Sequence, residues 1–186
     1  MGLETALGSL LAAFGLSGAA GLNAWLPLLA SALLARLDVV ELASPFDELS
    51  SNTGIVVLAL LTAADFVGDK VPLVDHALHL LGTIVAPVSG ALLFTGQTGL
   101  ETDLPTVVAV VLGALTVGST HLVRSTVRPV STAATGGLGN PILSLGEDLG
   151  SLTLVFLSFV LPLLAVLLLA WLLIAFARRR SARSAL

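Results

Sequence analysis

Apolar runs separated by short polar segments occupy almost the whole chain of 186 residues. The runs cover residues 5–36, 53–69, 74–95, 104–123, 139–159 and 161–177. Each run holds at least the roughly 17 residues that a helix needs to cross the hydrocarbon core of a bilayer. The pattern therefore predicts an all-α integral membrane protein with about six transmembrane helices.

Two of the apolar stretches contain residues that interrupt helices. The centre of the first run is rich in such residues: Gly15, Gly18, Gly21, Asn23 and Pro27. Because glycine weakens a helix and proline removes a backbone donor, this run forms either one tilted helix or a broken one. The stretch 131–177 is too long for a single helix, and Pro162 is predicted to begin the last one, since proline is tolerated in a first turn.

Composition supports the membrane class and argues against several others. The chain is 56% hydrophobic and 11% charged, with a mean hydropathy of +1.04, whereas a soluble domain is about a quarter charged. The lack of cysteine excludes disulfides and thiolate metal sites. Without a basic stripe, nucleic acid is not an expected partner. The lipid bilayer is the expected partner, and a homo-oligomer is left open. An enzyme is not expected, because the chain has no GxSxG or HExxH motif.

The distribution of charge between the runs predicts their orientation. The segments 37–52 and 96–103 carry acids and no base. Most of the bases lie elsewhere, at Lys70, Arg124, Arg128 and in the segment 178–183. Because basic loops stay in the cytoplasm, these residues are predicted to mark the cytoplasmic face. An even number of spans then puts both termini in the cytoplasm of a multi-pass protein in the plasma (inner) membrane.

The chain is predicted to form one transmembrane domain that contains two related halves. The expected parts are the domain 1–178, with halves 1–97 and 103–178, and the basic cytoplasmic tail 179–186. The octapeptides LTAADFVG (61–68) and LSLGEDLG (143–150) align without gaps, with an acid at the fifth place and glycine at the eighth. Three spans per half predict a 3+3 inverted repeat with helices interrupted by glycine and proline. A chance match is the alternative.

Acids inside the apolar runs are the main functional signal, because a charge at mid-bilayer costs at least about 2.5–3.5 kcal/mol. The predicted ligands or proton carriers are Asp65, Asp69, Glu147 and Asp148, with Asn23 and Asn140 as neutral oxygen ligands. Such oxygens suit a divalent or monovalent cation, and no other cofactor is expected. The alternative is that the acids only pair helices, for example as Asp69–Arg128, or that Glu147 is protonated and bonded to the backbone.

Three motifs resemble those of a known family. They are GLNAWLPLLASALLARL (21–37), DFVGDKVPLVDHALHLLGTIVAPVSGALL (65–93) and NPILSLGEDL (140–149). Together they resemble a bacterial integral membrane family defined as a domain of unknown function, number four-one-two-six. The resemblance implies a six-helix membrane protein in which these acids matter, with glutamate usual at position 65 and alanine at position 68.

A fainter resemblance concerns DFVGDK (65–70). It is similar to the E-x-G-D-K motif of the calcium/manganese–proton exchangers of the lysine-exporter superfamily, which also have 3+3 inverted repeats. The chain has one extra residue between the acid and GDK, and its second copy, GEDLGS, has no lysine. The resemblance implies cation exchange through carboxylates.

Three functions follow from these observations. The first is a small cation transporter or channel, in which the two halves rock about a midplane carboxylate site. The second is a non-transporting scaffold or accessory subunit, whose acids only pair helices. The third is a flippase of a lipid-linked or small organic solute, with Lys70, Arg124 and Arg128 attracting an anionic head group.

Overall fold

The structure is a computed structural model that describes residues 3–68, 72–99 and 102–184. Within these ranges it is all-α and contains no strand, as predicted. The elements are α1 (Leu3–Leu22), α2 (Leu26–Arg36), the short 3₁₀ helix η1 (Phe46–Ser50), α3 (Asn52–Gly68), α4 (Pro72–Thr98), α5 (Thr106–Thr135), α6 (Asn140–Val160) and α7 (Pro162–Ser184).

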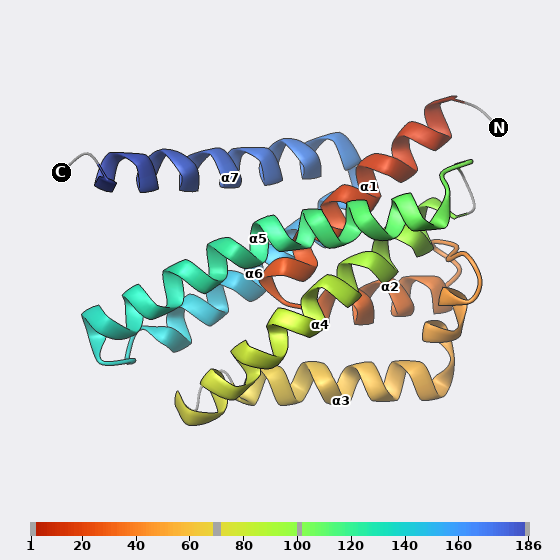
Figure 1. The fold of residues 1–186 in the computed structure, drawn as a ribbon. Helices are drawn as coiled ribbons and strands as arrows, with labels where there is room; N and C mark the ends of the chain where they lie inside the picture. Colours follow the sequence, from red (N-terminus) through yellow and green to blue (C-terminus); the bar gives the residue numbers. More distant parts are fainter. Residues whose placement is uncertain (1–2, 69–71, 100–101, 185–186) are drawn as a thin grey trace.

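The first apolar run is a broken helix that doubles back on itself. α1 ends at Leu22, and α2 begins at Leu26 with Pro27 in its first turn. Thr5 near the start of α1 and Glu41 just after α2 line the same cavity, so the outer ends of the two helices lie together. Figure 1 shows the resulting hairpin, with its break inside the helical bundle.

The fourth apolar run was predicted to end at residue 123 and to be followed by a basic loop at 124–130, and this prediction is wrong. α5 continues to Thr135 through Pro129 and ends at Gly136, which has a φ of +61°. Arg124 and Arg128 are therefore helical residues, only 7% and 4% exposed. Because they are four positions apart, they share the face of α5 that meets α6. Their burial on this face allows the helix to continue beyond the apolar run.

α1 is the central helix, and small residues let its neighbours come close. It packs against α4, α5, α6 and α7. A Cβ atom added at Gly21 would lie 2.7 Å from the carbonyl oxygen of Val117 in α5. The Ser17 hydroxyl donates a hydrogen bond of 2.9 Å to the carbonyl oxygen of Gly90 in α4. Such contacts are typical of helix packing inside membranes.

Four helices of the described residues are long and apolar enough to cross a membrane: Glu4–Leu22, Thr106–Thr135, Asn140–Val160 and Pro162–Arg180. α2 and α3 are shorter apolar helices. Six spans are therefore not confirmed. Neither is the inverted repeat, since the first half contains the α1–α2 hairpin whereas α5 is continuous.

The two termini lie at opposite ends of the bundle (Figure 1). Phe14 of α1 packs near Ala109 at the start of α5, whereas Arg180 near the end of α7 lies beside Val130, close to the end of α5. The prediction that both termini lie on one side is thus not confirmed. α7 also continues to Ser184, so most of the basic tail is helical.

Candidate functional site

Asn23 occupies the break between α1 and α2 and is only 2% exposed. Its Oδ1 atom accepts hydrogen bonds from the backbone N–H groups of Trp25 (3.1 Å) and Leu26 (3.0 Å). These donors belong to the start of α2 and have no partner within the helix, so the side chain caps α2. The capping bonds fix the amide, and its Nδ2 atom faces away from α2.

The Nδ2 atom of Asn23 joins two carboxylates from different helices. It donates to Oδ2 of Asp65 in α3 at 3.1 Å and to Oδ1 of Asp148 in α6 at 2.8 Å. We call Asn23, Asp65 and Asp148 the Asn23 cluster. The cluster unites three of the six predicted cation-site residues, and it takes one acid from each predicted half of the chain.

The Asn23 cluster concentrates negative charge away from solvent. Asp65 and Asp148 are 7% and 8% exposed, and one oxygen of each lies within 3.1 Å of the same nitrogen. The other oxygen of Asp148, Oδ2, is buried and has no hydrogen-bond partner among the described residues. A positive charge close to two neighbouring carboxylates offsets their mutual repulsion.

Glu147 contacts arginines, whereas its neighbour Asp148 contacts Asn23. Its carboxylate pairs with Arg128, whose Nη2 lies 2.5 Å from Oε2, and with Arg124, whose Nε lies 3.1 Å from Oε2. All three side chains are less than 10% exposed. The geometry does not favour the predicted cation-ligand role for Glu147, because two guanidinium groups already occupy its surroundings. It matches instead the alternative, in which acids pair helices.

Among the described residues, Asn140 does not join the Asn23 cluster. Asn140 donates from Nδ2 to Thr132 Oγ1 at 2.9 Å and links α6 to the end of α5. Asp69, the expected partner of Arg128, and Lys70 lie outside the described residues. Within the described ranges, no group of three or more His, Cys, Asp or Glu side chains could hold a metal ion.

α6 also carries a polar stripe that was not predicted from the sequence. Ser144, Ser151 and Ser158 are fully buried, and the Ser151 hydroxyl donates to the Ala19 carbonyl oxygen at 3.1 Å. The three serines recur every seven residues, a spacing that places them on one face of a helix. The buried face of α6 could have been predicted from this spacing in the sequence.

His121, expected from the sequence at the membrane interface, is 9% exposed on the face of α5 that carries Arg124 and Arg128. Its Cε1 atom would lie 3.5 Å from a Cβ atom added at Gly82 of α4. The 121, 124, 128 spacing marks a single helix face. Together with the stripe on α6, this face makes the inside of the bundle polar and leaves the outside apolar.

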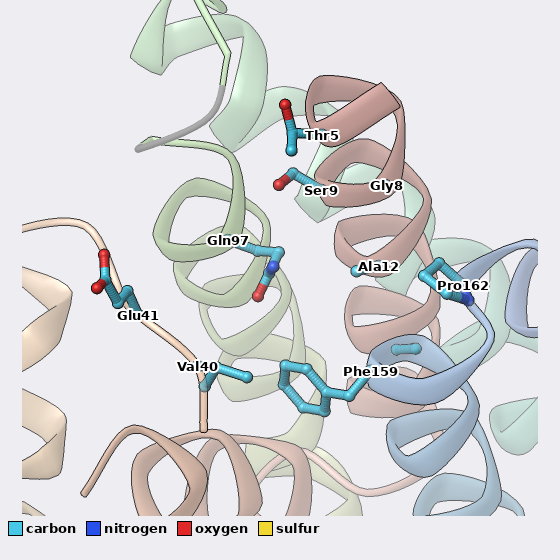
Figure 2. A pocket seen from close by; sticks show the side chains of 10 residues that line it. Thr5, Gly8, Ser9, Ala12, Val40, Glu41, Gln97, Phe159 and Pro162 are labelled. Atoms are coloured by element: carbon cyan, nitrogen blue, oxygen red, sulfur yellow. The ribbon is translucent and has the colours of Figure 1, made fainter. Parts of the chain in front are cut away.

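A cavity of about 350 Å³ opens at the end of the bundle where α1 begins. Figure 2 shows its polar lining, with Thr5 and Ser9 from α1, Gln97 from α4 and Glu41 after α2. The buried Oε1 atom of Gln97 has no hydrogen-bond partner among the described residues. Asn23 lies 14 residues beyond Ser9, or about 21 Å along a helix axis. The cavity and the Asn23 cluster are therefore separate features.

Long apolar helices with a polar interior define this chain as an all-helical membrane protein. Large apolar side chains are exposed on the outer faces, among them Leu60, Ile84, Leu115, Phe156 and Trp171. In water so much exposed apolar surface would promote aggregation, whereas lipid solvates it.

The chain belongs to the family described as Domain of unknown function (DUF4126), whose model matches residues 10–181. The predicted family is thereby confirmed. No curated protein and no solved structure matches the chain. The comparisons thus give no support to the fainter exchanger resemblance, and the function has to be argued from the Asn23 cluster.

Proposed function

We propose that the protein is a small membrane transporter that binds one positive charge, a proton or a monovalent metal ion, at the Asn23 cluster. The observation that carries the proposal is the meeting of two buried carboxylates on one amide at a broken helix. Ionisable groups inside a membrane protein are costly and usually functional. Ion-coupled transporters place their sites at such breaks, between two parts of the fold.

The chemistry of the cluster favours a single positive charge over a divalent metal ion. The Asn23 oxygen caps α2 and is not directed at the acids. Glu147 is paired with arginines, which leaves two carboxylates in the cluster. A calcium ion takes six to eight oxygen ligands, whereas two carboxylates supply at most four, so carbonyl groups or waters would have to complete its coordination shell. One proton or one monovalent ion relieves the repulsion between Asp65 and Asp148.

The arrangement of the helices also supports a revised membrane topology. In this proposal α1 and α2 form a re-entrant hairpin, and α3, α4, α5, α6 and α7 each cross the membrane. The acidic segments 37–52 and 96–103 then lie outside with the N-terminus. Lys70 and the arginines of α7 lie in the cytoplasm, as the positive-inside rule requires. The odd number of crossings agrees with termini at opposite ends of the bundle.

The two-half mechanism remains part of the proposal. Asp65 belongs to the half 1–97 and Asp148 to the half 103–178, so relative motion of the halves would open or close the Asn23 cluster. The aligned octapeptides match Asp65 with Glu147, yet Asp148 is the residue that shares Asn23 with Asp65. An inverted repeat, if present, is therefore shifted by one residue at the site.

Ion flux into proteoliposomes tests the transport proposal. We expect purified protein to carry protons, Na⁺ or K⁺ down an imposed gradient, and the Asp148→Asn variant to fall to the level of empty vesicles. Asparagine keeps the shape of Asp148 and removes the negative charge that the cation needs. The flux is followed with a pH-sensitive dye and with Na⁺- and K⁺-sensitive dyes trapped inside the vesicles.

The matched control is Asp103→Asn, which removes an exposed acid and should keep the flux of the unmodified protein. Folding of each variant is checked by gel filtration and circular dichroism. A folded Asp148→Asn variant with full flux, or an unmodified protein with no flux of any of the three ions, would overturn the proposal.

A non-transporting scaffold is the second candidate, and the pairing of Glu147 with Arg124 and Arg128 favours it. These charges join α5 to α6 and need no ion. A scaffold predicts no flux in the unmodified protein and only a change in stability when Asp148 is replaced.

A further inference from the structure

A groove of about 690 Å³ runs between α5 and the second half of α7. α7 packs against the bundle near its beginning, where Ala165 and Leu169 are buried. Beyond that point α7 and α5 border an open groove, lined by Val127 on one side and by Trp171 and Phe176 on the other. The groove is within the roughly 300–1,000 Å³ range of ligand pockets.

One end of the groove is strongly basic. Arg179 and Arg180 line it, directly after the apolar residues of α7. Neither α5 nor α7 contains an aspartate or glutamate. The groove thus combines an apolar channel with an excess of positive charge at one end, a distribution that complements a molecule with an apolar chain and an anionic head.

We infer that this groove binds an anionic phospholipid of the surrounding bilayer. An acyl chain lies along Val127, Trp171 and Phe176, and the phosphate contacts Arg179 and Arg180. Basic residues next to a membrane helix attract anionic lipid, and each arginine is expected to raise the affinity for the lipid about fivefold. Trp171 is 63% exposed and offers a large apolar surface to an acyl chain. The inference is independent of the transport proposal, because the groove does not include the Asn23 cluster.

Thermal unfolding in mixed micelles tests the inference. Phosphatidylglycerol should raise the unfolding temperature more than phosphatidylcholine with the same acyl chains. In the double variant Arg179→Gln/Arg180→Gln, the phosphatidylglycerol concentration that gives half of the effect should rise by roughly fivefold for each arginine. The matched control is Arg178→Gln, which removes an exposed arginine of the same helix that does not line the groove.

A second variant tests the groove itself. Ala175→Phe fills the channel with a larger apolar side chain and leaves every arginine in place. We expect it to remain folded and to lose the preference for phosphatidylglycerol. Equal effects of the two lipids on the unmodified protein would overturn the inference. So would an equal loss in Arg178→Gln, or a full response in Ala175→Phe, since either would show that the basic helix end attracts lipid without the groove.

Discussion

Replacement of Glu147 with glutamine is expected to lower the free energy of unfolding by about 3–5 kcal/mol. Glu147 is the carboxylate between Arg124 and Arg128, and all three side chains are buried. Glutamine keeps the size of the side chain but removes the carboxylate charge that both buried guanidinium groups contact. Unfolding of the purified protein in detergent, by heat or by added dodecyl sulfate, measures the loss.

The control is Glu48→Gln, which neutralises an exposed acid in η1 and should change the unfolding midpoint very little. The double variant Glu147→Gln/Arg128→Gln should recover part of the stability, because one uncompensated charge is removed with the acid. If Glu147→Gln were as stable as Glu48→Gln, the buried ion pair would contribute nothing and the α5–α6 contact would need another explanation.

Replacement of Asn23 with alanine is expected to cost at least about 3 kcal/mol. The change removes the cap of α2 and the donor shared by Asp65 and Asp148. Hydrogen bonds to charged groups contribute about 1.5–3 kcal/mol each, and a lost cap about 1 kcal/mol. The same unfolding assay measures the effect, and the ion flux should be lost as well.

Asn140→Ala is the matched control, because Asn140 is a buried amide bonded to Thr132 outside the Asn23 cluster. It should cost about 1 kcal/mol and leave the ion flux intact. In a double-mutant cycle, Asn23→Ala and Asp148→Asn should be non-additive, since they share one hydrogen bond. Strict additivity of the two changes would mean that the Asn23–Asp148 contact does not form in the membrane.

Helix ends were predictable where local chemistry sets them. Pro162 begins α7 as expected, and α3 and α6 differ little from the predicted runs 53–69 and 139–159. The end of α5 was not predictable by hydropathy, which treats Arg124 as a loop residue. Arg124 and Arg128 are buried against α6, where Glu147 supplies a carboxylate to both. A partner distant in the sequence lets this helix continue past Arg124, and Gly136, with its φ of +61°, then ends it.

The candidate site, like the helix ends, could be predicted from the sequence only in part. The sequence singled out Asn23, Asp65 and Asp148, because polar groups in apolar runs are costly. It could not separate Asp148 from Glu147, which differ by one position and therefore point about 100° apart around α6. Which of them meets an arginine and which meets Asn23 depends on how α5 and the α1–α2 break pack against α6. The direction of the Asn23 amide likewise follows from the start of α2.

The most direct test of the central claim is thermal unfolding of the purified protein against Na⁺, K⁺, Ca²⁺, Mg²⁺ and Mn²⁺ over a series of pH values, repeated with Asp65→Asn and Asp148→Asn. A ligand at 100 times its dissociation constant stabilises by roughly 2.7 kcal/mol. A monovalent cation or acidification is expected to raise the unfolding midpoint of the unmodified protein, and this rise is expected to be absent in both variants. A midpoint that responds to no cation and to no change of pH, or that responds equally in all three proteins, would contradict a cation site at the Asn23 cluster.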